Sequence, residues 1–130
     1  MCKIVFPRGP VAWRILIIDD NVNFAENISE ILQIEGHLTD IAASAEEALD
    51  KALAARSDVV ITDYRLPGID GATLVRRLHE MGLRVHAIVI SAYTDERTIA
   101  DARNAGATFV PKPIDFEILG RAIHKKEGAA

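Results

Sequence analysis

Polar and charged residues follow four short apolar runs of this sequence, each close to the end of its run. These residues are Asp19, Asp20, Asp63, Ser91 and Lys112. If the four runs end at one place, three carboxylates meet there, and they would repel one another and resist removal from water. The ammonium of Lys112 and a hard divalent cation would compensate for that charge, and Mg²⁺ suits carboxylate and phosphate oxygens.

Carboxylates, a hydroxyl and an ammonium around a metal ion favour phosphoryl chemistry, which depends mainly on positioning and on neutralising oxygen charge. One aspartate would attack phosphorus and form an aspartyl phosphate. The other acids would hold the metal, while Lys112 and Ser91 would contact phosphoryl oxygens. Each residue alone has an ordinary explanation as a turn, a helix cap or a surface group. The convergence of all five is what indicates a site.

The elements that must position these residues alternate between short apolar runs and longer segments with helical spacing. The runs 15–18, 59–61 and 87–90 are apolar on both faces, and 39–42 and 108–110 are weaker examples. Such runs predict strands of a parallel sheet that is buried on both faces. The helical stripes are Phe24, Ile28, Ile31 and Leu32; Ala45, Ala48, Leu49, Ala52 and Leu53; Leu74, Val75 and Leu78; Ile99 and Ala102; and Ile118, Leu119, Ala122 and Ile123.

This order predicts an α/β fold in which a strand and a helix alternate five times, a three-layer sandwich with right-handed crossovers. Ligands bind such sheets at the carboxyl ends of the strands, which is where the polar residues fall. Two capping boxes, or close relatives of that motif, are expected, Asn23 with Glu26 and Ser44 with Glu47. The glycines expected to end helices are Gly36, Gly82 and Gly106.

Composition narrows the class of protein. The 130 residues suit one domain, and 49% are hydrophobic, as in a globular chain. The net charge of −4 argues against a nucleic-acid surface, so we expect no direct nucleic-acid binding. Cys2 is the single cysteine, which excludes an internal disulfide and a cysteine-based zinc site. No apolar run reaches the ~20 residues of a membrane span, and a cytoplasmic protein is expected.

Four segments together resemble the receiver domain of two-component response regulators. They are 15–21 (ILIIDDN), 63–71 (DYRLPGIDG), 91–93 (SAY) and 112–114 (KPI). The resemblance covers about residues 13–125. It implies a flavodoxin-like (CheY-like) fold with strand order 2-1-3-4-5, preceded by a flexible lead over 1–12 and followed by a tail over 126–130.

The resemblance also implies the role of each site residue. Asp63 would accept a phosphoryl group from a phosphohistidine of a sensor histidine kinase or a histidine phosphotransfer protein. Asp20, Asp63 and the backbone carbonyl of Arg65 would hold Mg²⁺ (or Mn²⁺), with Asp19 helping through water. Ser91 and Lys112 would contact the phosphoryl group, and the Lys112–Pro113 peptide would be cis.

Switching and signal lifetime are the next features that the resemblance implies. Ser91 and Phe109 would form the switch, although Tyr is common at the second position and only two residues separate Gly106 from Phe109. Arg65 and Tyr93 would flank the site and influence hydrolysis of the phosphoryl group. They could cover it and slow self-dephosphorylation, or stack on each other in the open.

Three readings of the function follow. The main one is a phosphorylation-switched signalling module that binds a downstream protein, or a second copy of itself, through the surface at 94–104, 108–110 and 115–124. The second is a degenerate receiver that acts as a constitutive interaction domain. The third is a metal-dependent phosphohydrolase, which is disfavoured because Arg65 stands where such enzymes resembling the dehalogenase group carry a second acid. A stand-alone regulator and a receiver excised from a longer protein both fit.

Overall fold

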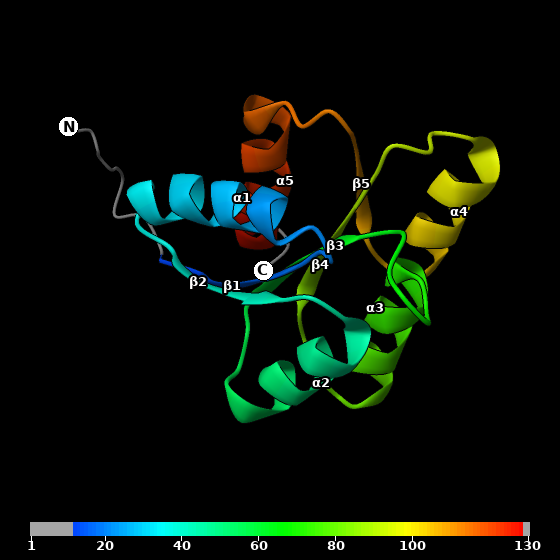
Figure 1. The fold of residues 1–130 in the computed structure, drawn as a ribbon, viewed down its shortest axis with the longest axis horizontal. Coiled ribbons are helices and arrows are strands. Elements are labelled where there is room, and N and C mark those ends of the chain that lie inside the picture. The colour runs from blue at the N-terminus through cyan, green and yellow to red at the C-terminus, as the bar shows by residue number, and fades with distance from the viewer. Residues whose placement is uncertain (1–11, 129–130) are drawn as a thin grey trace.

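Residues 12–128, which the computed structural model describes, form a parallel sheet with helices on both faces (Figure 1). The elements in chain order are β1 (Arg14–Ile18), α1 (Val22–Ile34), β2 (Leu38–Ala42), α2 (Ala45–Ala54), β3 (Val59–Asp63), α3 (Gly71–Glu80), β4 (His86–Ser91), α4 (Glu96–Asn104), β5 (Thr108–Pro111) and α5 (Phe116–Gly128). The strands pair in the order β2-β1-β3-β4-β5, all parallel. The predicted fold and strand order are confirmed.

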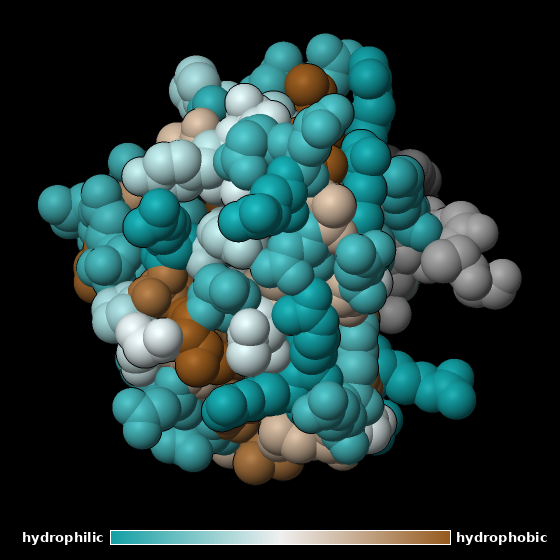
Figure 2. Space-filling model, turned by 90° about the vertical axis from the view of Figure 1, so that its right-hand side faces the viewer, coloured by the Kyte–Doolittle hydropathy of each residue, from teal (hydrophilic) through white to brown (hydrophobic). Residues whose placement is uncertain are grey.

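The two-residue period of the strands divides the core into layers. Ile15 and Ile17 of β1 pack with α1 and α5, whereas Leu16 and Ile18 pack with α2 and α3. Figure 1 shows the same arrangement, with α1 and α5 on one side of the sheet and α2 and α3 on the other. A third cluster lies between α3, α4 and the strands β4 and β5. The side that carries α3 and α4 is largely hydrophilic (Figure 2).

The helix boundaries follow side-chain caps. The Ser44 hydroxyl accepts from the backbone N–H of Glu47, and the Glu47 carboxylate accepts from that of Ala43, one residue before the cap, so this predicted motif is confirmed as a close relative of the capping box. The box at Asn23 is wrong, because α1 begins at Val22 and Asn21 is its cap. Asn21 sits at the end of the loop with extended backbone, as a capping residue must.

Two residues of the predicted helical stripes do not reach the core. Leu53 of α2 is 63% exposed and Ile118 of α5 is 41% exposed. Both lie one position beside residues that are buried, Ala52 and Leu119, so the stripe is narrower than the spacing suggested. The three glycines predicted to end helices have positive φ angles, which agrees with that role.

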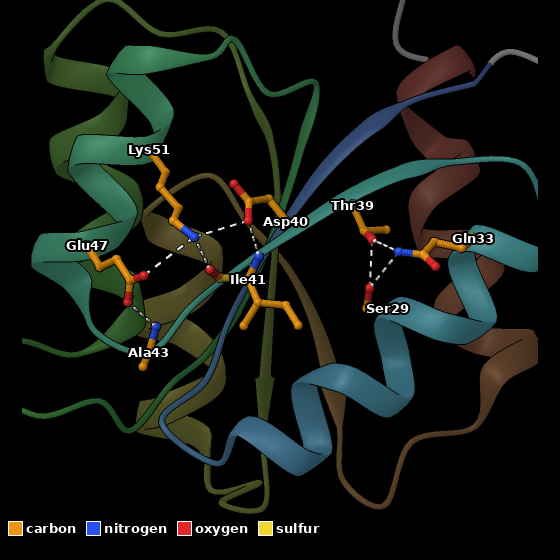
Figure 3. A network of polar contacts seen from close by, with 8 residues as sticks. All are labelled: Ser29, Gln33, Thr39, Asp40, Ile41, Ala43, Glu47 and Lys51. Carbon is orange, nitrogen blue, oxygen red and sulfur yellow. Dashed lines mark hydrogen bonds and ion pairs between the residues drawn. The ribbon is translucent and has the colours of Figure 1, made fainter.

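Side chains satisfy the outward backbone groups of one residue on the β2 edge of the sheet. β2 is an edge strand, and the backbone N–H of Ile41 donates to the Asp40 carboxylate while its carbonyl accepts from Lys51 at 2.6 Å (Figure 3). Lys51 also forms ion pairs with Asp40 and Glu47. These contacts satisfy backbone groups that could otherwise pair with a strand of another molecule.

The chain ends bear on the predicted boundaries. The expected lead over 1–12, with Cys2, lies outside the described residues except for Ala12. α5 continues to Gly128, so residues 126–128, assigned to a tail, belong to a helix.

The short connection between Gly106 and Phe109 leaves β5 paired with β4, with Thr108 opposite Ile88. Among the residues that are described, no helix has the length and apolarity to cross a membrane.

Candidate functional site

The five residues singled out in the sequence lie at the carboxyl ends of four strands. Asp63 and Ser91 are the last residues of β3 and β4, Asp19 and Asp20 follow β1, and Lys112 follows β5. Because the strands are parallel, these ends share one edge of the sheet. Carboxylate oxygens of Asp19, Asp20 and Asp63 lie within 4.8 Å of one another, so each can offer a ligand to one ion.

Lys112 provides the positive charge of this cluster. Its Nζ lies 3.5 Å from Oδ1 of Asp63 and 3.6 Å from Oδ2 of Asp19. The backbone N–H of Lys112 donates to the Ser91 carbonyl, which ties the end of β5 to the end of β4. The peptide between Lys112 and Pro113 is cis, as the resemblance implied. The ammonium therefore bridges two carboxylates that would otherwise repel each other.

Burial dominates the electrostatics of the cluster. Asp19 is 3% exposed and Asp63 is half-buried. Burial raises the pKa of the Asp63 carboxyl, and the charge of Asp19 raises it further, while Lys112 opposes both effects. Burial also raises the pKa of Asp19, against a backbone hydrogen bond and Lys112. A carboxylate pair held at this cost favours any cation that can reach it.

The first turn of α1 fixes the orientation of Asp19. The backbone N–H of Asn21 donates to Oδ1 of Asp19 at 2.9 Å. The Asn21 side chain accepts in turn from the N–H of Phe24, capping the helix. The Phe24 ring then lies under the Lys112 ammonium, 4.5 Å from Nζ to the ring centroid. Phe24 was assigned to the core from its helical spacing alone, and its contact with the site was missed.

The predicted switch residues lie on neighbouring strands, with Ser91 at the end of β4 and Phe109 second in β5, opposite Val89. Ser91 is 1% exposed, and its hydroxyl accepts from the backbone N–H of Tyr93 at 2.9 Å. A hydroxyl that accepts this bond keeps its own hydrogen to donate to another oxygen. Phe109 is partly buried against the cluster between α3 and α4.

Arg65 and Tyr93, the predicted flanking residues, stack on each other. The guanidinium carbon of Arg65 lies 4.5 Å from the centroid of the Tyr93 ring. Both residues are exposed, and Tyr93 keeps half of its surface in contact with water. Of the two arrangements that the sequence left open, the structure has the open stack.

Two further residues next to Asp63 were not singled out from the sequence. The backbone N–H of Gly71 donates to the Tyr64 carbonyl at 2.7 Å, and a Cβ on Gly71 would lie 2.4 Å from the carbonyl oxygen of Asp63. The N–H of Tyr64 donates to the Ile90 carbonyl at 2.8 Å. The segment 63–71 is one of the four that carry the resemblance, but only the folded chain brings Gly71 back against Asp63.

The chemistry of the donor set fits a hard divalent cation. Three carboxylates with converging oxygens, two of them with raised pKa values, match Mg²⁺ or Mn²⁺. An ammonium beside the same oxygens can contact an anionic group once the acids are neutralised by a metal. The edge can thus bind a metal ion and a phosphoryl group together.

Comparison with known proteins agrees with this geometry. The family model of the response regulator receiver domain matches residues 15–124. A response regulator receiver protein of Anaeromyxobacter sp. (strain Fw109-5) is 41% identical over 102 residues, which cover 78% of this chain and 43% of that protein. The chain therefore spans less than half the length of that relative. Sporulation initiation phosphotransferase F of Bacillus subtilis (strain 168) is 31% identical over 86% of this chain and 91% of its own.

Solved structures give the same result. The signal receiver domain of the putative response regulator NarL from Mycobacterium tuberculosis matches with a TM-score of 0.82 and 27% identity, covering 92% of this chain and 99% of that one. A CheY-like receiver domain protein from Methanospirillum hungatei JF-1 matches with a TM-score of 0.81 and 26% identity, covering 92% of this chain and all of that one.

Proposed function

The chain belongs to the response regulator receiver domain family, and we propose that it is a phosphorylation-switched signalling module whose phosphoacceptor is Asp63. The observation that carries the proposal is the position of the Asp63 carboxylate, beside two further carboxylates and 3.5 Å from the Lys112 ammonium. The proposed module spans residues 13–128, three residues beyond the boundary expected from the sequence, because α5 continues to Gly128, and it is proposed to work in the cytoplasm. A relative of similar length is named a phosphotransferase.

In the proposed reaction, an oxygen of the Asp63 carboxylate forms a bond to phosphorus. The bond from phosphorus to the nitrogen of a phosphohistidine breaks, its electron pair returns to the imidazole, and the imidazole takes up a proton. The donor would be a sensor histidine kinase or a histidine phosphotransfer protein. Lys112 would contact one phosphoryl oxygen and the Ser91 hydroxyl would donate to another.

Asp20, Asp63 and the backbone carbonyl of Arg65 would hold Mg²⁺ (or Mn²⁺), and Asp19 would contribute through water. The bound ion would supply positive charge against the carboxylate and phosphoryl oxygens. Asp19 is suited to an indirect role because one of its oxygens already accepts from Asn21 and the other faces Lys112.

The output of the switch is proposed to be a change in the surface of α4, β5 and α5. In this surface, α5 contributes two exposed apolar side chains, Phe116 and Ile118, and α4 contributes charged residues. Ser91 at the site and Phe109 beneath this surface would connect the two. The unidentified occupant would be a downstream protein or a second copy of the chain.

The experiment is an intact-mass measurement after incubation with acetyl phosphate and Mg²⁺. The wild-type protein should gain the mass of one phosphoryl group, and should gain none when the metal is chelated. Asp63→Asn should gain none, because the amide cannot act as the nucleophile. Asp50→Asn, a change at an exposed aspartate of α2, is the matched control and should behave as the wild type.

Two results would contradict the proposal. A wild-type chain that gains no mass with several phosphoryl donors would be a constitutive interaction domain of this fold. A phosphorylated Asp63→Asn protein would place the phosphoacceptor elsewhere.

A further inference from the structure

Helix α4 is held to the rest of the molecule by little apolar surface. Its buried residues are Thr98 and Ala102. The cluster beneath it consists mainly of alanines, namely Ala72, Ala87, Ala102, Ala105 and Ala107, with Val75 and Val89. An alanine side chain is a single methyl group, so each buries less apolar area than the isoleucines and leucines under α1 and α5. Polar contacts therefore carry a larger share in holding α4 than in holding those helices.

One carboxylate of α4 makes the polar contacts that can do this. The Tyr64 hydroxyl donates to Oδ2 of Asp101 at 2.8 Å. The Arg76 guanidinium, from α3, pairs with Oδ1 of the same side chain and reaches the Asp101 backbone carbonyl at 3.4 Å. Both oxygens of Asp101 are thus bound by groups from outside α4. We call these three side chains, Tyr64, Arg76 and Asp101, the α4 tether.

At neutral pH, Asp101 and Arg76 of the α4 tether are charged and Tyr64 is a neutral hydrogen-bond donor. The Arg76 and Tyr64 hydrogen bonds lower the pKa of Asp101 below its ordinary value. Burial and the bond to Asp101 raise the pKa of Tyr64 to about 12, so its hydroxyl keeps the proton that it donates. A hydrogen bond to a charged acceptor is stronger than one between neutral groups.

Tyr64 is also the residue that directly follows the phosphoacceptor. Its backbone is held on both sides, since its N–H donates to Ile90 and its carbonyl accepts from Gly71. Its ring packs on the alanine cluster together with Phe109. Because the backbone and ring are held in this way, a displacement of the Asp63 peptide moves the Tyr64 hydroxyl. That hydroxyl is hydrogen-bonded to Asp101, so its movement displaces α4.

We propose that the α4 tether is a positioning device that couples the peptide of Asp63 to the placement of α4. It holds α4 against α3 in the unphosphorylated chain, where the two helices lie next to each other at one end of the sheet (Figure 1) on a largely hydrophilic side of the molecule (Figure 2). Its part in signalling rests on the function proposed above. Tyr64 and Asp101 are positioning residues, because neither is placed to touch the phosphoryl group.

The first test is hydrogen–deuterium exchange on the unphosphorylated full chain, in wild type, Tyr64→Phe and Tyr93→Phe. The chain has two tyrosines, so Tyr93→Phe is a matched control that loses a hydroxyl outside the tether. Tyr64→Phe should speed exchange in residues 96–104 by about tenfold, with α1 and α2 unchanged. Wild-type exchange in 96–104, or an equal rise in α1 and α2, would overturn the proposal.

The second test asks whether the hydrogen bond itself is responsible. Asp101→Ala should speed exchange in 96–104 on its own, and adding Tyr64→Phe to it should have no further effect, because the bond is already lost. If the two changes instead add, Tyr64 acts on α4 by another route and the tether is refuted.

The third test adds acetyl phosphate and Mg²⁺. In wild type, phosphorylation should change exchange in 96–104, and in Tyr64→Phe that change should shrink while the gain in mass stays the same. An undiminished change in Tyr64→Phe would overturn the coupling. If the wild type gains no phosphoryl mass, the proposed function fails, whereas the first two tests still decide whether the tether holds α4.

Discussion

Gly71 is the residue whose substitution should damage the site without touching any of its charged groups. It is the first residue of α3 and is buried against the end of β3. Its φ angle is not in the left-handed region, so backbone conformation does not require glycine there. Space does, because a Cβ at this position would lie 2.4 Å from the carbonyl oxygen of Asp63 and 3.1 Å from Cγ2 of Thr62.

The size of the effect follows from that distance. Ordinary contacts of a Cβ begin at 3.4 Å, so Gly71→Ala needs a displacement of about 1 Å between α3 and the backbone of Asp63. The short hydrogen bond from Gly71 to Tyr64 resists any withdrawal of α3. Overpacking of this kind costs about 2 kcal/mol, which lowers the Tm by roughly 8 °C in a domain of this size. A shift of about 1 Å in a reacting group can also slow phosphorylation by about 100-fold.

The assay measures both consequences on the same samples. Thermal unfolding gives the Tm, and the rate of mass gain with acetyl phosphate and Mg²⁺ gives the phosphorylation rate. Gly120→Ala is the matched control, because Gly120 lies within α5 with nothing within 4 Å of the new Cβ. That change should stabilise the protein by about 0.5–1 kcal/mol, since glycine disfavours a helix interior, and should leave phosphorylation unchanged.

A Gly71→Ala protein that melts at the wild-type temperature and accepts phosphate at the wild-type rate would refute this reasoning. It would mean that α3 moves aside freely and that the backbone of Asp63 is not constrained by it. A lower Tm with a normal phosphorylation rate would separate the two consequences, and would place the displacement in α3 and not in Asp63.

Three further changes test other parts of the site and its surroundings. Asp20→Ala should weaken Mg²⁺ binding by removing one of three carboxylates, and a tenfold weaker affinity would remove about 1.4 kcal/mol of the stabilisation seen with saturating Mg²⁺ in a thermal-shift titration. Lys112→Ala should still accept phosphate but lose the phosphorylation-dependent change in exchange over α4 and β5, because its ammonium contacts the phosphoacceptor. His37 lies between α1 and β2 and is buried, and burial lowers the pKa of its imidazole from the ordinary value of 6.5. The stability that depends on neutral His37 is therefore present above pH 6.5 and is lost as the pH falls through the folded-state pKa. His37→Asn should reduce the fall in Tm between about pH 7.5 and about pH 5.5.

The fold could be predicted because apolar residues follow one spacing in the strands and another in the helices. The runs at 15–18, 59–61 and 87–90 are apolar on both faces, and only a sheet covered on both sides buries them. Which residues of each helical stripe reach the core was harder to predict. Leu53 and Ile118 each lie one position from a buried residue, and tertiary packing decides which of two adjacent helix positions faces the sheet.

The charged residues of the site were predictable because strand ends converge in a parallel sheet. Asp19, Asp63 and Lys112 each follow an apolar run, and the fold then brings them within a few ångströms of one another. Phe24, Gly71 and the α4 tether were missed for a different reason. Their contacts join residues from different elements, such as Tyr64 with Asp101, and no local pattern in the sequence encodes them.

The stack of Arg65 on Tyr93 gives a last prediction, about how long the phosphoryl group survives. The two side chains lie in the open, yet each belongs to a loop that directly follows Asp63 or Ser91. A guanidinium has no acceptor for a proton of water and a phenol is a poor base, so any influence on hydrolysis must come from bulk and charge. Because the stack is open, we expect Arg65→Ala and Tyr93→Ala to lose phosphoryl mass at the wild-type rate once the donor is removed. Faster decay in either variant would mean that the two side chains cover the phosphoryl group and shield it from the attacking water.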